Sequence, residues 1–213
     1  MIQNGGRLVV DCLLNLGAQR VFGVPGESYL AVLDALYDVQ EKIDFTLCRH
    51  EGGAAYMAAA YGKLTQRPGI CFVTRGPGAT NASIGVHTAA QDSVPMLLFV
   101  GQVATHMQGR EAFQEIDFRA AFGSVAKWAT QIDQVERIPE IISRAWKTAI
   151  SGRPGPVVVA LPEDVLSAQA QATAVTQSFP LSEPAADTPA LAQVQQLLSA
   201  AKRPVLLYGG CNW

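Results

Sequence analysis

The chain has 213 residues, of which 49% are hydrophobic and 16% charged, so it is a globular protein with room for one complete domain and part of a second. Its net charge of −2 lacks the basic excess of a nucleic-acid-binding protein, and no apolar run approaches the roughly 18 residues that span a bilayer. Its four cysteines form no CxxC pair and its N-terminus lacks the pattern of a signal peptide, so we expect a cytoplasmic protein with reduced thiols and no metal site.

Helical and extended patterns alternate along residues 1–166. Apolar residues recur at helical spacing after Asn4, and nearly continuous apolar runs are typical of strands that are covered on both faces. The predicted strands cover residues 20–23, 45–48, 70–74, 95–100 and 157–161, with a weak sixth strand at Trp128, and the predicted helices cover residues 5–16, 30–36, 51–62, 79–91 and 139–150. This alternation predicts an α/β fold, a doubly wound six-stranded parallel sheet with helices on both faces.

The pattern changes after position 166. Residues 167–190 are rich in Ala, Gln, Ser, Thr and Pro and show little periodicity, which predicts an exposed linker. A helix over 191–201, a strand over 204–208 and a turn at Gly209-Gly210 are predicted to follow. A lone helix and strand cannot bury their apolar faces, so we expect residues 191–213 to be the truncated beginning of a second, central α/β domain.

Four loops leave the carboxyl ends of the predicted strands, which is where open parallel sheets bind ligands. They cover residues 24–28, 49–53, 75–81 and 101–117. Gly76-Pro77-Gly78 precedes a helix and either binds an anion or only forms a sharp turn, while the absence of GxGxxG and GxxxxGKS/T motifs argues against a nucleotide. Glu51 opens a helix, and taken alone such an acid usually only complements the helix dipole.

Five sequence motifs in these loops and beyond them give a more specific indication. They are Val21-Phe22-Gly23-Val24-Pro25-Gly26, Arg49-His50-Glu51, Gly76-Pro77-Gly78-Ala79-Thr80-Asn81, Gly101-Gln102 with Ala112-Phe113-Gln114-Glu115, and Ser151-Gly152-Arg153-Pro154-Gly155-Pro156-Val157. In this order and spacing they resemble acetolactate synthase and its relatives. Residues 1 to about 165 are similar to the N-terminal, pyrimidine-binding domain of a thiamine-diphosphate-dependent enzyme, and the end of the chain resembles the start of that family's central domain.

The resemblance implies a role for each loop. Glu51 is the predicted catalytic acid: it would hydrogen-bond ring nitrogen N1′ of the cofactor's aminopyrimidine and so promote removal of the proton from thiazolium C2, work that suits a partly desolvated carboxylate. Gln114 would act near the reacting centre, and Phe113 would line the substrate pocket. The predicted cofactor-binding residues are Val24, Pro25, Gly26, Glu51, Pro77 and Asn81.

Glu27 stands where typical acetolactate synthases carry a small residue. Related 2-oxo-acid decarboxylases resemble the chain differently, because they place an acid or a serine there, facing substrate. Glu27 is therefore a predicted substrate residue that would favour protonation over ligation; the alternative is a carboxylate that only answers the helix dipole. The paired histidines of those decarboxylases are absent, since Ala112-Phe113-Gln114-Glu115 stands in the later loop, and Ala104 replaces a proline of the synthases.

The resemblance implies a thiamine-diphosphate-dependent 2-oxo-acid carboligase, which decarboxylates pyruvate or a similar acid and transfers the product to a second carbonyl. The alternatives are a thiamine-diphosphate-dependent decarboxylase or oxidase, and a non-catalytic binding module with the same fold. The family holds Mg²⁺ and the diphosphate with a Gly-Asp-Gly…Asn segment on a C-terminal domain, which this chain lacks, and builds its site between subunits. We therefore expect a homodimer or homotetramer, and a fragment that alone is inactive and binds the cofactor weakly; the use of FAD stays open.

Overall fold

The centre of the molecule is a parallel sheet. The computed structural model describes residues 2–176, 185–207 and 209. Its six-stranded sheet has the order β3-β2-β4-β5-β7-β6 with every neighbouring pair parallel, which confirms the prediction. The central strands β4 and β5 are buried at every residue, as expected where helices cover both faces. The strands are β2 (Arg20–Gly23), β3 (Asp44–Leu47), β4 (Gly69–Val73), β5 (Met96–Gln102), β6 (Trp128–Gln131) and β7 (Pro156–Pro162).

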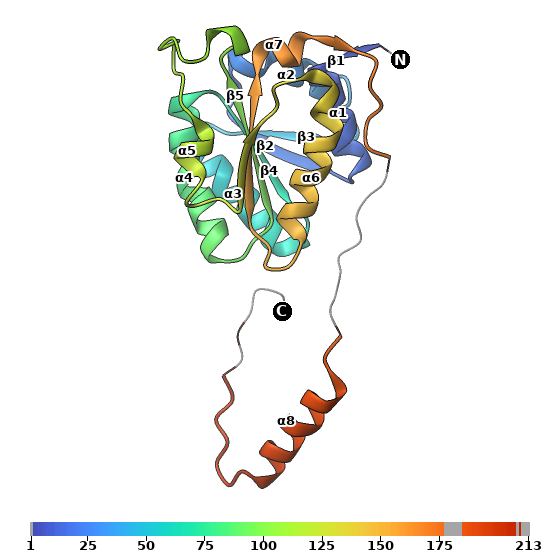
Figure 1. Cartoon of the computed structure of the whole chain (residues 1–213), viewed down its shortest axis with the longest axis vertical. Coiled ribbons are helices and arrows are strands. Elements are labelled where there is room, and N and C mark those ends of the chain that lie inside the picture. Colours follow the sequence, from blue (N-terminus) through green and yellow to red (C-terminus); the bar gives the residue numbers. More distant parts are fainter. Residues whose placement is uncertain (1, 177–184, 208, 210–213) are drawn as a thin grey trace.

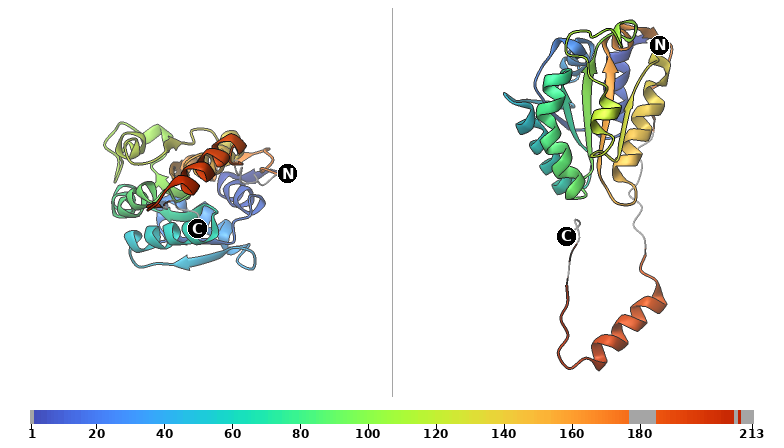
Figure 2. Two further views of the ribbon diagram at one scale, coloured as in Figure 1. Left: turned by 90° about the horizontal axis from the view of Figure 1, so that it is seen from below. Right: turned by 60° about the vertical axis from the view of Figure 1, so that its left-hand side comes forward.

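Two layers of helices enclose the sheet, which is seen between them in the right-hand view of Figure 2 (see also Figure 1). One face carries α1 (Gly5–Asn15), α2 (Leu30–Tyr37), α6 (Ile138–Ile150) and α7 (Glu163–Ser167), and the other carries α3 (Glu51–Thr65), α4 (Gly76–Gln91) and α5 (Phe118–Phe122). Short 3-10 helices are η1 (Glu27–Tyr29), η2 (Thr105–Met107) and η3 (Val135–Arg137). The doubly wound arrangement is confirmed. Within the described ranges, no helix is both long and apolar enough to cross a membrane.

Local sequence explains where several helices begin and end. The side chain of Asn4 accepts a hydrogen bond from the first turn of α1 and caps it as predicted. Helix α4 begins at Gly76, three residues before its predicted start, because Pro77 in the first turn has no N–H to leave unpaired. Helix α3 runs slightly past its predicted end and stops at Gln66, whose φ of 58° is left-handed.

The predicted linker over residues 167–190 is wrong at its start. Strand β8 (Gln169–Ala170) pairs antiparallel with β1 (Gln3–Asn4), and Ala170 is 5% exposed. Ala172, Ala174 and Val175 also pack against the core. Local composition does not reveal this strand pair, because it joins two short segments from opposite ends of the domain. Residues 177–184 of the predicted linker lie outside the described residues.

The predicted helix of the second domain is present, but the predicted strand is not. Helix α8 (Thr188–Ala200) starts three residues before the predicted position, with Pro189 in its first turn. Residues 204–207 form no strand, and Leu207 is 98% exposed. An apolar run alone cannot form a strand without a neighbour to pair with. Tyr208 and Gly210 of the predicted strand and turn lie outside the described residues.

The three cysteines in the described residues are buried and form no disulfide: Cys12, Cys48 and Cys71. Burial raises the pKa of the Cys12 thiol to about 11, so it stays protonated at neutral pH. Burial also raises the pKa of Cys71, as does the neighbouring Cys48. These thiols are core residues, as predicted from the apolar runs around them. Cys211 lies outside the described residues.

Helix α3 lies directly against the start of β4. A Cβ atom at Gly69 would lie 1.7 Å from the backbone oxygen of Ala58 in α3. No side chain fits there without moving the helix, because the obstructing atom belongs to backbone. This contact fixes the distance between α3 and the sheet, and therefore the position of the residue that opens α3.

We expect Gly69→Ala to lower the free energy of unfolding by about 3 kcal/mol, because the added methyl group must displace α3. Gly53→Ala is the matched control: Gly53 lies in the same helix, and a Cβ atom added there would meet nothing within 4 Å, so this change should be neutral or stabilise by up to about 1 kcal/mol. Urea denaturation of both variants measures the difference. Equal midpoints for the two would contradict the tight contact.

Candidate functional site

The candidate site lies at the carboxyl ends of β2 and β4. These strands are neighbours, but the chain leaves β2 toward α2 on one face and β4 toward α4 on the other, and in open parallel sheets ligands bind at such a switch point. The hydroxyl groups of Ser28 and Thr74 lie 2.8 Å apart and join the loops. A Cβ atom at Gly26 would lie 2.7 Å from Cβ of Thr74, so only glycine allows this approach.

Glu51 is the first residue of α3 and lies beside these loops. The ring of His50 caps the helix by accepting the N–H of Gly52 at 3.0 Å. One carboxylate oxygen of Glu51, Oε2, accepts a hydrogen bond from Nδ2 of Asn81 in the second turn of α4, at 2.9 Å. The carboxylate is half-buried, and its hydrogen-bond partner in the described structure is an amide rather than a cation. The structure therefore brings together two residues that the sequence predicted for one site.

Gly78 lies beside the Glu51 carboxylate. It is buried, and a Cβ atom there would lie 3.1 Å from Cγ2 of Thr74 and 3.6 Å from Oε1 of Glu51, so the glycine lets the loop pack closely. Pro77 and Asn81, which flank Gly78 along the chain, are exposed. Pro25 is exposed on the loop after β2, while Val24 is half-buried there. Among the described residues, Asn81 is the hydrogen-bond partner of Glu51 and it bonds Oε2, so Oε1 is able to accept a hydrogen bond from a ligand.

Tyr29 holds the loop after β2 in place with its buried side chain. Its side chain is 1% exposed and stacks on Phe72, and its hydroxyl donates a hydrogen bond to the carbonyl of Val24 at 2.5 Å. Burial raises the pKa of this phenol above its ordinary value, and the charges of Cys71 and Glu51 act in the same direction. Tyr29 was not predicted to belong to the site, because a tyrosine at the start of an apolar helix carries no distinguishing pattern.

The backbone of Gln114 contacts the start of α4, and the side chain of the neighbouring Phe113 is exposed. The carbonyl of Gln114 accepts the N–H of Gly76 at 3.0 Å, and Gln114 has a left-handed φ of 63°. A Cβ atom at Gly76 would lie 2.9 Å from that carbonyl, so glycine is required for the contact. The side chain of Phe113 is 73% exposed. The loop is therefore anchored at the site through Gln114, and the substrate role of Phe113 stays a prediction.

Glu27 belongs to an ion-pair cluster that the sequence analysis missed. Nη1 of Arg75 lies 2.8 Å from Oε1 of Glu27, and Nη2 lies 2.8 Å from Oε2 of Glu163. Arg75 lies in one of the four loops but had no predicted role. The sequence feature that could have indicated this role is an arginine directly after a buried strand, because a guanidinium there needs hydrogen-bond partners. Glu27 therefore does more than interact with the dipole of its helix.

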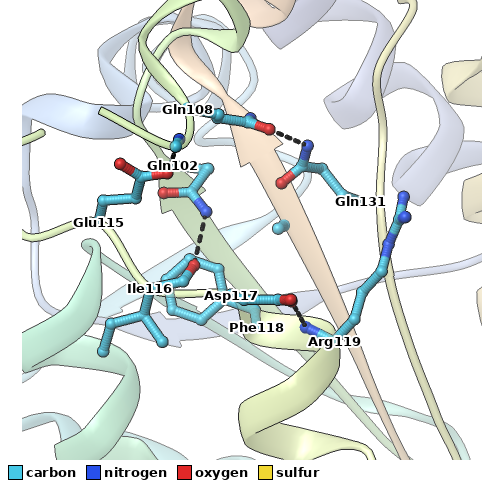
Figure 3. A pocket seen from close by; sticks show the side chains of 10 residues that line it. Gln102, Gln108, Glu115, Ile116, Asp117, Phe118, Arg119 and Gln131 are labelled. Atoms are coloured by element: carbon cyan, nitrogen blue, oxygen red, sulfur yellow. Dashed lines mark hydrogen bonds between the residues drawn. The ribbon is translucent and has the colours of Figure 1, made fainter. Parts of the chain in front are cut away.

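A separate cavity of about 330 Å³ lies at the carboxyl ends of β5, β6 and β7 (Figure 3). Its lining includes Gln102, Gln108, Glu115, Asp117, Arg119 and Gln131 but none of the predicted site residues. Gln102 donates to the carbonyl of Ile116 and accepts from Val103, while both oxygens of Glu115 accept backbone N–H groups. No group of three or more acidic, histidine or cysteine side chains in the described residues could hold a metal ion.

Comparison with known proteins identifies relatives. Residues 3–121 match the family model described as thiamine pyrophosphate enzyme, N-terminal TPP binding domain. The large subunits of acetolactate synthase isozymes 2 and 3 of Escherichia coli K12 are 38% and 40% identical over 97% of this chain and 37% of their own length. The large subunit of Corynebacterium glutamicum acetolactate synthase is 40% identical over 97% of this chain and 33% of its own length. The chain spans about a third of each relative.

We expect Tyr29→Phe to cost about 1 kcal/mol of stability at neutral pH, because the Val24 carbonyl loses its donor. The raised pKa of Tyr29 favours the folded state below the ordinary phenol pKa of about 10, and this advantage is lost as pH rises above it. Between pH 10 and 11 the wild type should therefore lose about 1 kcal/mol more than the variant, because half of the unfolded chains are already ionised at pH 10. Denaturation at each pH measures this; Tyr37→Phe, at a side chain 71% exposed, is the control and should behave as wild type.

Proposed function

Because the chain belongs to the thiamine pyrophosphate enzymes and carries their N-terminal cofactor-binding domain, we propose that it is part of an acetolactate-synthase-like carboligase. Such an enzyme decarboxylates a 2-oxo acid such as pyruvate and transfers the remaining carbons to a second carbonyl. The family match and the named relatives support the proposal, since each relative aligns with nearly the whole of this chain.

The observation that carries the proposal is the hydrogen bond between Glu51 and Asn81, which occupies one of the two oxygens of the Glu51 carboxylate. Asn81 occupies Oε2 of Glu51, which leaves Oε1 to hold a proton at N1′ of the aminopyrimidine. We assign the walls of the ring site to Val24, Pro25, Gly26 and Pro77. When bound, thiamine diphosphate supplies a carbon nucleophile and an acceptor for the electron pair that carbon dioxide leaves behind. The protein's part is to orient the ring and to set its proton state.

The remaining assignments complete the proposed assembly. Gln114 is proposed as a polar group near the reacting atoms, since its loop is anchored to Gly76, and Phe113 as a substrate contact. Mg²⁺ and the cofactor's diphosphate are proposed to bind outside these 213 residues, because no diphosphate motif occurs in them. We also propose a cytoplasmic protein. A homodimer or homotetramer that shares the site between subunits agrees with this division of the cofactor-binding groups.

The second candidate is a thiamine-dependent decarboxylase or oxidase, for which Glu27 is the supporting residue. A proton donor at that position would release an aldehyde instead of a ligated product. The ion pair with Arg75 argues against that role, because Oε1 of Glu27 is engaged by the guanidinium at 2.8 Å. The third candidate, a non-catalytic module, conflicts with the intact Glu51 and its free oxygen.

We expect Glu51→Gln in the full-length protein to slow the exchange of the thiazolium C2 proton by about 100-fold or more, because an amide cannot hold the proton at N1′. Proton NMR of samples quenched after mixing with deuterium oxide measures the exchange. Glu41→Gln, a change of the same kind at an exposed site, should exchange at the wild-type rate. Wild-type exchange in Glu51→Gln would refute the assigned role of Glu51.

We expect the full-length protein, supplied with pyruvate, thiamine diphosphate and Mg²⁺, to release carbon dioxide and to form products with a new carbon–carbon bond. Acetolactate forms from two molecules of pyruvate, and a hydroxyketone forms when an aldehyde is the acceptor. Chromatography of the products distinguishes these from free acetaldehyde or acetyl phosphate. Either of the latter as the main product would favour the decarboxylase or oxidase.

A further inference from the structure

Arg75 joins three loops at the carboxyl end of the sheet. It follows β4, while its partners Glu27 and Glu163 follow β2 and β7. Each terminal nitrogen of Arg75 donates to one of these carboxylates at 2.8 Å. The side chain of Arg75 is 8% exposed, whereas those of Glu27 and Glu163 are 69% and 44% exposed. The guanidinium is therefore the buried member of the cluster, and the two carboxylates contact it from the surface.

The stability of the fold gives little reason for an arginine at this position. Its Nε atom is buried without a hydrogen-bond partner among the described residues. Removing a guanidinium from water often costs as much free energy as its ion pairs recover, and an apolar side chain of similar size is often tolerated in its place. Without Arg75, water could solvate the two carboxylates, because both are partly exposed. The cluster therefore calls for a different explanation.

The ion pair with Glu27 is one of two adjacent contacts between the loops after β2 and β4. Directly beside it along both segments, the hydroxyl groups of Ser28 and Thr74 lie 2.8 Å apart. A single contact would let one loop turn about the other, whereas two contacts side by side fix their relative orientation. The contact of Arg75 is the stronger of the two, because both of its members are charged.

This ion pair joins direct neighbours of the proposed ring-site walls. Gly26 precedes Glu27, and Pro77 follows Arg75 by two positions. The distance between the two walls therefore depends on the backbone that the ion pair holds together. The loop that carries Glu163 contains no residue assigned to the ring site, so the second ion pair of Arg75 should not affect this distance.

The acid of the site is positioned by a different contact. Asn81 holds Oε2 of Glu51 at 2.9 Å, and the helices that carry them meet where a Cβ atom at Gly85 would lie 2.5 Å from Cβ of Ala55. This contact lies within α3 and α4 and does not involve the loop after β2. Loss of the ion pairs of Arg75 should therefore move a wall of the ring site and leave the pair of Glu51 and Asn81 in place.

We propose that Arg75 is a positioning residue which, through Glu27, fixes the distance between the two walls of the ring site. The inference rests on the proposed function, because the ring site is part of it, and it specifies what holds that site at a width that fits the cofactor's ring. Arg75 itself contacts neither the ring nor the substrate. Loss of the ion pair should weaken the binding of the aminopyrimidine and leave the binding of the diphosphate, which is proposed to lie outside these residues, unchanged.

The test is calorimetric titration of the full-length protein in the presence of Mg²⁺, with thiamine diphosphate and inorganic pyrophosphate as separate probes. Arg75→Met should bind thiamine diphosphate about tenfold more weakly than the wild type, which is the free energy of one charge-assisted hydrogen bond. Glu27→Gln should bind it about threefold more weakly, because its amide oxygen still accepts a weaker bond. Both should keep the wild-type affinity for pyrophosphate. An equal loss for the two probes would indicate a general change of structure and would overturn the inference.

Two further variants test whether Arg75 acts through Glu27. Glu163→Gln is the matched control, because it changes the same guanidinium's other partner, at the same 2.8 Å, on a loop outside the ring site. It should keep the wild-type affinity for thiamine diphosphate. The double variant Arg75→Met, Glu27→Gln should bind no more weakly than Arg75→Met alone. Equal losses in Glu163→Gln and Glu27→Gln, or additive losses in the double variant, would contradict the proposal.

Turnover gives a second readout and separates this inference from the proposed function. With pyruvate as substrate, Arg75→Met should raise the KM for thiamine diphosphate about tenfold and leave kcat at saturating cofactor nearly unchanged, because Glu51 stays in place. A wild type that binds thiamine diphosphate, with the same affinity and KM in Arg75→Met, would overturn the inference alone. A wild type that binds no thiamine diphosphate in the presence of Mg²⁺ would overturn the proposed function and the inference with it.

Discussion

The close approach of α3 and α4 is the constraint on which the site depends. A Cβ atom at Gly85 in α4 would lie 2.5 Å from Cβ of Ala55 in α3, so the two helices meet through small residues. At this separation, Asn81 of α4 can reach Glu51 at the start of α3 with an ordinary hydrogen bond of 2.9 Å. A larger residue at Gly85 would separate the helices and the pair together. Glycine at this contact therefore serves the geometry of a polar site as much as the packing of the core.

The loop after β4 treats its two neighbouring carboxylates in opposite ways. Arg75 neutralises part of the charge of Glu27 and holds it rigidly, while Asn81 offers Glu51 a neutral donor that leaves one oxygen open. A charged partner would compensate the charge of Glu51, whereas an amide orients the side chain without adding a counter-charge. The difference between guanidinium and amide is thus a difference between an ion-paired carboxylate and one that is only oriented.

Sequence patterns predicted the features that depend on local order. The six strands follow from apolar runs between turn residues, whereas the pairing of Glu51 and Asn81 in one site was implied by the resemblance to the acetolactate synthases. The Arg75 cluster could not be predicted, because its partners lie 48 and 88 residues away and no local pattern pairs them. The β1–β8 pair was missed for the same reason. The predicted strand over 204–208 differs in the opposite way, since a local pattern was present but residues 204–207 have no pairing partner in the described part of the chain.

Sheet topology alone would allow a second ligand site, and side-chain chemistry separates the two. β5 and β7 are neighbours whose following helices, α5 and α7, lie on opposite faces, so the cavity in Figure 3 also occupies a crevice between diverging loops. Gln102 uses both its donor and its acceptor within the loop, and Glu115 accepts two backbone N–H groups, whereas Nε2 of Gln108 is buried without a hydrogen-bond partner among the described residues. The hydrogen bonds of Gln102 and Glu115 make the loop that carries Gln114 rigid. The loops after β2 and β4 offer a different group, because Oε1 of the Glu51 carboxylate has no hydrogen-bond partner in the described part of the chain. A carboxylate accepts a hydrogen bond, whereas an amide N–H donates one, and this difference in chemistry, more than the shape of the sheet, is the reason we propose the ring site beside Glu51.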